Sequence, residues 1–315
     1  FRTALALGAG PGEVGLRGLL ATFERDACRW GPAAEELEAF REAARRLRDG
    51  DLVWTTPFVH ATLVDDPAEQ LAMARHCSHN LASKVTPLSA PPATRRPGRL
   101  RLGYLSGDFH QHATAILMAE MLEAHDRDRV EVTLYSHGPD DGTAMRARMV
   151  AACEHFVEVR HLSDDEAAQR IRDDAIDILV DLKGYTLDHR LQILARRPAP
   201  VQVAFLGYPG TTGAPFIDYV VGDPIVTPLS HAPHWSEKIA QMPVCYQPND
   251  RQRARPPVPA RSAIGLPEDA LVLCGFNQPF KISAEVFDVW CSVLRRLPQA
   301  VLWLLATGDT DRQVE

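Results

Sequence analysis

Long apolar runs are missing from this sequence. No stretch approaches the 18 or more consecutive apolar residues that a membrane-spanning helix requires. The first residues also lack the basic segment and the small-residue cleavage site of a secretory signal. These two absences predict a cytoplasmic protein.

Positive charge is in short supply as well. Lysine and arginine together number 34 against 41 aspartates and glutamates, which gives a formal net charge of −7. A surface that binds nucleic acid needs a basic face, so this balance argues against nucleic-acid binding. It leaves room for a local basic pocket.

Paired cysteines and the common nucleotide motifs are also absent. The six cysteines show no C-x-x-C spacing, so neither a zinc ribbon nor a disulfide framework is indicated, and we expect buried, reduced thiols. No G-x-G-x-x-G follows the first predicted strand, and no G-x-x-x-x-G-K-[ST] occurs. The absence of these motifs argues against a nicotinamide-dependent dehydrogenase and against a P-loop nucleotidase.

What remains is the composition of a folded protein with more than one domain. The 315 residues are 45% hydrophobic and 24% charged, close to globular averages. Single hydrophobic cores stop growing at about 250 to 300 residues, so one compact module is not expected.

Residues 1–86 are predicted to be helical. Apolar residues recur at helical spacing over residues 16–30 and 33–47, and Asp65 and Asp66 precede Pro67 as the N-terminal cap of a third helix. The opening Phe1-Arg-Thr-Ala-Leu resembles the end of a tetratricopeptide repeat. A single incomplete unit shows no period, and a repeat array needs about three units to bury a core, so any array would lie upstream of Phe1. We therefore expect a repeat end followed by transition helices, in a chain that begins within a longer protein.

Two α/β units are predicted after the helices. Residues 87–99 carry four prolines and predict a linker. Short apolar runs alternate with helical segments over residues 100–246, the pattern of a doubly wound parallel sheet. A second linker is predicted at 247–260, and a second α/β unit at 261–315 with strands at 270–276 and 300–306. Two strands are too few for an independent sheet, so we expect this lobe to continue beyond the chain.

Polar and glycine-rich loops follow several predicted strands, at residues 107–114, 183–186, 206–213 and 277–281. Ligands of open parallel sheets bind beyond the carboxyl ends of the strands, which predicts one cleft between two lobes. Simpler interpretations are turn glycines and a solvated Lys281. Asp108, His110 and His112 alternate and could ligate a metal, although the two histidines would need a rigid third ligand.

Several motifs in these loops are specific enough to identify a family. They are GYLSGDFHQHAT (Gly103 to Thr114), ILVDLKGYT (Ile178 to Thr186), RRPAPVQVAFLGYPGTTG (Arg196 to Gly213) and CGFNQPFKI (Cys274 to Ile282). The chain resembles the protein O-GlcNAc transferase family, including its SPINDLY-type and bacterial members. That resemblance implies a GT-B fold of two Rossmann-like lobes, of which the second is truncated here.

The resemblance also implies site residues, position by position. His112 and Asp108 match residues in the proton path from the acceptor hydroxyl, and either could be the base. Gln278 and Lys281 match residues that hold the nucleotide diphosphate, and a fixed ammonium at Lys281 would stabilise the charge on the leaving group. The remaining matches line the sugar and phosphate pocket: Thr114, Tyr185, Leu206, Gly207 and Pro209.

The activity implied by the resemblance is an inverting transfer of GlcNAc from UDP-GlcNAc to serine or threonine hydroxyls of proteins, without metal or other cofactor. The expected partners are the nucleotide sugar and protein or peptide acceptors, with the rest of the second lobe supplied by the same protein. One alternative is SPINDLY-type transfer of fucose from GDP-fucose. Another is a non-catalytic, repeat-linked scaffold, which Ala113 and Phe280 keep open because animal relatives have proline and tyrosine there.

Overall fold

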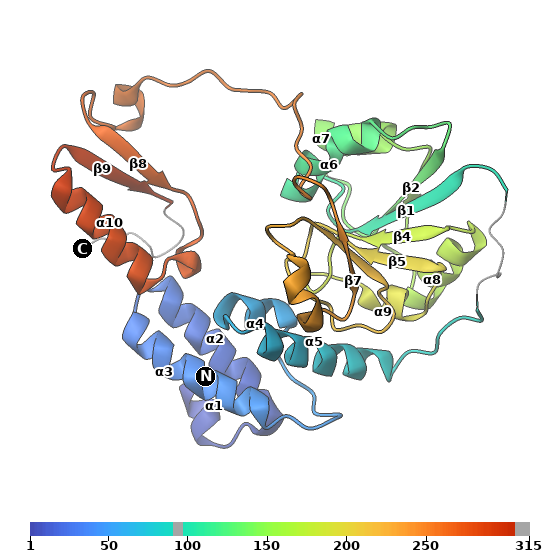
Figure 1. The fold of residues 1–315 in the computed structure, drawn as a ribbon, viewed down its shortest axis with the longest axis horizontal. Helices are drawn as coiled ribbons and strands as arrows, with labels where there is room; N and C mark the ends of the chain where they lie inside the picture. Colours follow the sequence, from blue (N-terminus) through green and yellow to red (C-terminus); the bar gives the residue numbers. More distant parts are fainter. Residues whose placement is uncertain (91–96, 306–315) are drawn as a thin grey trace. The chain divides into compact units, whose positions relative to one another are not determined.

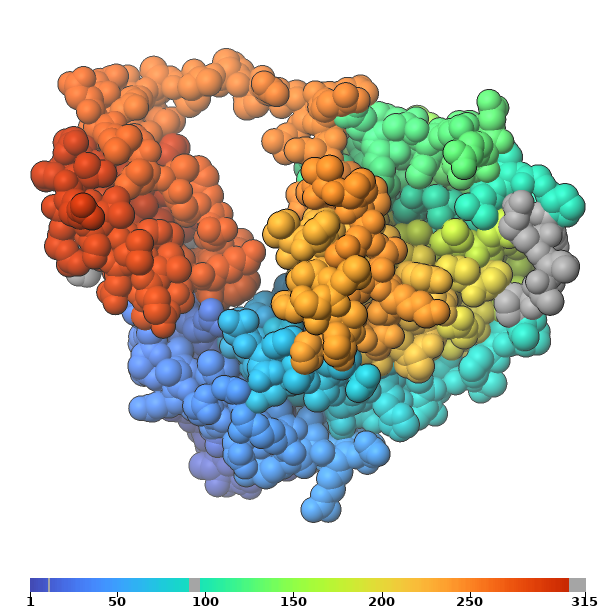
Figure 2. Space-filling view, viewed as in Figure 1, coloured from blue at the N-terminus to red at the C-terminus, as the bar shows by residue number. Residues whose placement is uncertain are grey.

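The computed structural model describes residues 1–90 and 97–305. These residues form two compact units, drawn from blue to red along the sequence in Figures 1 and 2. The larger unit is Thr56–Ala61 with Asp66–Arg253, and the smaller unit is Phe1–Thr55, Thr62–Asp65 and Ala254–Glu315. Residues 91–96 of the first predicted linker, and Ala306 at the end of the last predicted strand, lie outside the described residues.

The larger unit is built on a seven-stranded parallel sheet with the order β3-β2-β1-β4-β5-β6-β7. The strands are β1 (Leu100–Ser106), β2 (Val130–Ser136), β3 (His155–Glu158), β4 (Ile178–Asp181), β5 (Val201–Ala204), β6 (Tyr219–Gly222) and β7 (Lys238–Gln241). This confirms the predicted parallel α/β sheet. The sequence did not predict β7, because this edge strand alternates exposed and half-buried residues and has no apolar run.

Helices cover both faces of this sheet, as Figure 1 shows. They are α5 (Pro67–Ala82), α6 (Ala113–Glu123), α7 (Ala144–Ala151), α8 (Asp164–Asp173) and α9 (Leu191–Ala195). Side chains alternate between faces along a strand, so Leu134 and its neighbour Tyr135 on β2 enter two different buried clusters. The predicted cap of α5 is confirmed, since the Asp66 carboxylate accepts from the backbone N–H groups of Ala68 and Glu69.

The strand order places a topological switch point between β1 and β4. The chain proceeds from β1 through β2 to β3 on one side, then returns to β4 on the other side of β1. In open α/β sheets the crevice beyond the carboxyl ends of two such strands is the usual ligand site. The fold therefore directs attention to the residues that follow β1 and β4.

The smaller unit combines helices from the start of the chain with a short α/β segment. Its elements are α1 (Arg2–Ala6), η1 (Gly10–Gly12), α2 (Glu13–Asp26), α3 (Trp30–Arg45), η3 (Arg261–Ile264), β8 (Leu271–Gly275), η4 (Pro279–Lys281), α10 (Ala284–Arg296) and β9 (Ala300–Leu304). Trp30 Nε1 donates to the carbonyl of Ile282 at 3.1 Å, and its ring lies 5.3 Å from that of Phe287. The first helices thus contact the segment after β8, while the domain boundaries expected from the sequence stay a prediction.

Two further elements are a helix at the boundary between the units and a short helical turn before β7. Helix α4 (Pro57–Leu63) crosses the boundary between the units, and η2 (Leu229–His234) precedes β7. Among residues 1–90 and 97–305, no helix has the length and apolar character needed to cross a bilayer.

Candidate active site

A buried ion pair joins the ends of β1 and β4 across the switch point. Asp108 lies two residues after β1 and Lys183 two residues after β4, and each is only 7% exposed. Lys183 Nζ donates to Asp108 Oδ1 at 2.9 Å and to Oδ2 at 3.0 Å. The two charges compensate each other where water is excluded, which a buried charge requires.

The backbone around this pair is held by further polar contacts. The Asp108 N–H donates to Ser106 Oγ at 3.0 Å. The N–H groups of Lys183 and Gly184 donate to the carboxylate of Asp181 at 3.2 and 2.7 Å. Burial raises the pKa of Asp181 to about 6. These contacts fix both the strand end and the turn from which the Lys183 side chain departs.

His112 stands beside the ion pair at the start of α6. Its Nδ1 accepts from the Thr114 N–H at 3.2 Å and lies 3.7 Å from Asp108 Oδ2. Its side chain is 43% exposed, so Nε2 is the nitrogen left to meet a substrate. Burial is the largest influence and lowers the pKa of His112 below 6.5, with Asp108 opposing and Lys183 reinforcing that shift. A neutral imidazole near pH 7 can accept a proton.

Two more imidazoles lie close to Lys183. Burial, followed by the charges of Arg190 and Lys183, lowers the pKa of His137 to about 4. Burial and the charge of Lys183 also lower the pKa of His189. Within the described part of the chain, His137 Nε2 and His189 Nδ1 are buried without a hydrogen-bond partner. The ion pair is therefore flanked by neutral imidazoles.

The loop after β5 approaches the end of β4 very closely. A Cβ on Gly207 would lie 1.8 Å from the carbonyl oxygen of Leu182, so only glycine fits. The preceding Leu206 has φ +67°, in the left-handed region that a leucine rarely adopts. Backbone strain of this kind clusters at functional sites, where the surrounding structure maintains it.

Other predicted residues help to build this loop. The Tyr185 hydroxyl donates to the carbonyl of Thr212 at 3.0 Å, and the side chain is buried. Buried Glu237 accepts from the Thr212 N–H at 2.6 Å and from the Thr211 hydroxyl at 2.6 Å. Pro209 is exposed. Buried contacts thus hold the loop at Thr211 and Thr212, while Pro209 faces solvent.

Gln278 and Lys281 belong to the smaller unit. Both are exposed, and the Lys281 N–H donates to the carbonyl of Gln278 at 2.9 Å within the turn η4. Lys281 Nζ lies 5.9 Å from the centroid of the Phe280 ring. The ammonium is therefore open to solvent beyond the end of β8.

The structure brings together Asp108, His112 and Thr114 after β1, and Tyr185, Leu206 and Gly207 after β4 and β5. Sequence reasoning missed Lys183. The available signal was a lysine directly after a buried strand, in a chain whose other lysines are Lys84, Lys238 and Lys281.

The metal alternative gains no geometric support from these residues. His110 Nδ1 lies 3.7 Å from Asp141 Oδ2, whereas Asp108 is engaged by Lys183. Over residues 1–90 and 97–305, no group of three or more histidine, cysteine, aspartate and glutamate side chains could hold a metal ion.

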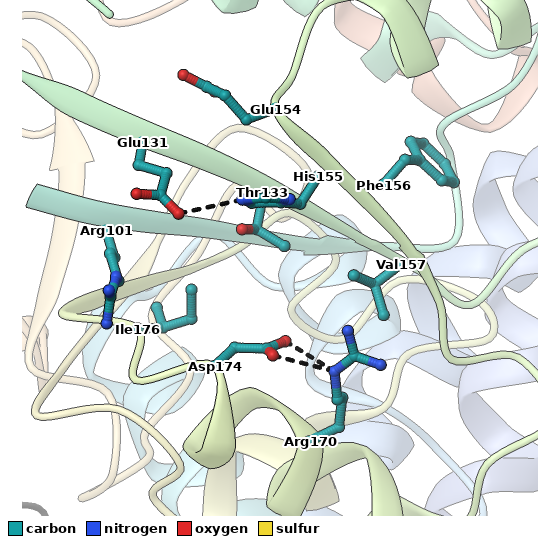
Figure 3. A pocket seen from close by; sticks show the side chains of 10 residues that line it. All are labelled: Arg101, Glu131, Thr133, Glu154, His155, Phe156, Val157, Arg170, Asp174 and Ile176. Carbon is teal, nitrogen blue, oxygen red and sulfur yellow. Dashed lines mark hydrogen bonds and ion pairs between the residues drawn. The ribbon is translucent and has the colours of Figure 1, made fainter. Parts of the chain in front are cut away.

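A polar cavity of about 610 Å³ lies away from these residues. It is lined by residues near the beginnings of β1, β2 and β3, including Arg101, Glu131 and His155, as Figure 3 shows. His155 Nε2 lies 3.1 Å from Glu131 Oε1, and Arg170 pairs with Asp174 at 2.9 Å. None of the predicted site residues lines this cavity, which lies at the amino ends of the strands.

Comparison with known proteins gives a consistent result. The profile of glycosyl transferase family 41 matches residues 73–256 and 247–312. The probable UDP-N-acetylglucosamine–peptide N-acetylglucosaminyltransferase SEC of Arabidopsis thaliana is 41% identical over 266 residues, which cover 79% of this chain and 27% of that protein. The SPINDLY protein of the same plant, described as another probable enzyme of this kind, is 32% identical over 210 residues, covering 64% and 22%.

A solved structure agrees as well. A mutant of the Thermobaculum terrenum O-GlcNAc transferase superposes with a TM-score of 0.74 at 32% identity, over 98% of this chain and 57% of that chain. The chain thus spans about a quarter of the length of these curated relatives.

Proposed function

Because this chain belongs to glycosyl transferase family 41, we propose that it forms part of a protein glycosyltransferase that moves GlcNAc from UDP-GlcNAc to serine or threonine hydroxyls. One observation carries the proposal: a half-exposed, neutral imidazole at His112 lies beside the buried carboxylate of Asp108 at the β1/β4 switch point. The names of the relatives support the donor and the acceptor class.

His112 is the residue to which we assign the proton. In an inverting transfer, the acceptor oxygen forms a bond to C1 of the sugar while the bond from C1 to the diphosphate breaks, and that electron pair leaves with the diphosphate. The hydroxyl proton passes to Nε2 of His112 in the tautomer that carries its hydrogen on Nδ1, with Nδ1 facing Asp108 Oδ2 instead of accepting from Thr114. Asp108 is less suited to this step because Lys183 occupies both of its oxygens. A positioned general base of this kind contributes typically 10²- to 10⁴-fold in rate.

The leaving group requires positive charge. The exposed ammonium of Lys281 is proposed to stabilise the departing diphosphate, with Gln278 as a further contact, so that no metal ion is needed. The strained turn at Leu206 and Gly207, together with Thr114, Tyr185 and Pro209, is proposed to shape the sugar and phosphate pocket.

Transfer of radiolabelled sugar by the intact protein tests the proposal. UDP-GlcNAc and GDP-fucose are offered separately with protein acceptors, using the wild type, His112→Ala, and His155→Ala as a control at an exposed histidine. We expect GlcNAc transfer that His112→Ala abolishes and His155→Ala retains. Transfer from GDP-fucose alone would overturn the donor assignment, and no transfer from either donor would favour the scaffold.

A further inference from the structure

Lys183 makes contacts that a surface lysine does not make. Its ammonium is buried and donates to both oxygens of Asp108, whose Oδ2 lies 3.7 Å from His112 Nδ1. We propose that Lys183 is a positioning residue of the transfer reaction, which holds the Asp108 carboxylate charged and aimed at His112. The inference rests on the proposed function, because it assigns Lys183 a role in the proton transfer at His112.

The contacts of Lys183 fix the orientation of the Asp108 carboxylate. Two N–H bonds to one carboxylate fix the rotation of that group, and burial of both partners excludes the water that would otherwise compete. The backbone of Lys183 is itself held by Asp181. The turn after β4 therefore sets the orientation of Asp108, whose carboxylate faces His112, the N-terminal cap of α6.

The charges that face these groups act in opposite directions. His112 is influenced by Asp108, Lys183 and His110, and His110 itself lies beside Asp141. Asp108 raises the pKa of His112 and Lys183 lowers it. The surroundings of Lys183 further include Asp181, His137 and His189. Removing either member of the ion pair should therefore move the titration of His112, and in opposite directions.

Chemical modification of His112 measures this titration without any sugar donor. Diethyl pyrocarbonate reacts with the neutral imidazole. The intact protein is labelled at each pH, and mass spectrometry of the peptide that contains His112 gives the rate of reaction at that residue. We expect Lys183→Met to raise the midpoint by about one pH unit and Asp108→Asn to lower it by about one, the lower end of the effect of a charge within 4 to 6 Å. Lys238→Met, at an exposed lysine, should leave it unchanged.

The opposite signs separate positioning from simple packing. If Lys183 only fills space, both variants loosen the site, and both midpoints move upward toward that of a free histidine. That result would overturn the proposal. If Lys183→Met does not fold, the double variant Asp108→Asn/Lys183→Met takes its place, because neither charge is then buried alone. A midpoint equal to that of Asp108→Asn alone would also overturn it.

The transfer assay adds a second readout. Lys183→Met should lower kcat at least tenfold while the KM for the donor changes little, and Lys183→Arg should recover part of the loss. Because the modification experiment needs no donor, a protein without glycosyltransferase activity would refute the proposed function and still report on Lys183. An unchanged kcat in folded Lys183→Met would refute the positioning role by itself.

Discussion

Acid should act on the stability of the larger unit through two buried groups of opposite sign. Burial lowers the pKa of His137 from 6.5 to about 4, and raises that of Asp181 from 3.8 to about 6. Between pH 6.5 and 4 the unfolded chain binds more protons at His137, so acidification destabilises the fold there. Between pH 6 and 3.8 the folded protein binds more protons at Asp181, so acidification stabilises it.

The two contributions nearly cancel at pH 5. At about 1.4 kcal/mol per pH unit, the one and a half units below 6.5 cost about 2 kcal/mol at His137. The single unit below 6 returns about 1.4 kcal/mol at Asp181. For these two groups alone, the wild type should lose less than about 1 kcal/mol between pH 7.5 and pH 5.

Single substitutions should reveal the hidden contributions. Urea unfolding followed by circular dichroism at pH 7.5 and 5.0 gives the change in unfolding free energy for each variant. On acidification, His137→Gln should gain about 1.4 kcal/mol relative to its own value at pH 7.5, and Asp181→Asn should lose about 2 kcal/mol. His155→Gln, at an exposed histidine, should follow the wild type. Parallel curves for all four proteins would refute the reasoning.

Three further outcomes are expected. Lys281→Ala should reduce kcat by about 10²-fold or more in the intact enzyme, because its charge acts on the leaving group, and near-normal turnover of a folded variant would remove it from the site. Activity should survive EDTA, whereas loss on chelation with recovery on adding Mn²⁺ would restore the metal alternative. Gly207→Ala should lower the free energy of unfolding by about 2 kcal/mol or more in thermal or urea unfolding, since its Cβ meets a backbone oxygen at 1.8 Å. Gly142→Ala, with φ +66° and open space, should cost only about 1 to 2 kcal/mol, and equal losses would contradict the steric argument.

Local patterns accounted for most of the larger unit's fold. The first apolar run of the unit predicted at 100–246 is β1 (Leu100–Ser106), because an apolar run bounded by turn residues carries its own limits. The cap at Asp66 was equally readable, since an aspartate directly before proline satisfies two N–H groups of the first turn. The edge strand β7 lacks such a run, and its pairing with β6 is what makes it a strand.

The candidate site was only partly predictable, because its central contact is not local. Lys183 and Asp108 are 75 positions apart, and no spacing rule connects them. The parallel order β1-β4 brings them together, and that order follows from the whole sheet. His137 was missed for the same reason: it follows β2, and its proximity to Lys183 depends on how three strand ends meet.

The choice of lysine at position 183 has a physical basis in a chain that otherwise relies on arginine. Arg190 donates to Asp164 and to the carbonyls of Val159 and Leu162, because a guanidinium carries five donors that need several acceptors when buried. The ammonium of Lys183 is compact, and the two oxygens of Asp108 occupy most of its donors. It can thus neutralise one carboxylate without drawing further acceptors into the space beside His112. An arginine there would keep the charge but require new partners, which is why Lys183→Arg should restore the reaction only in part.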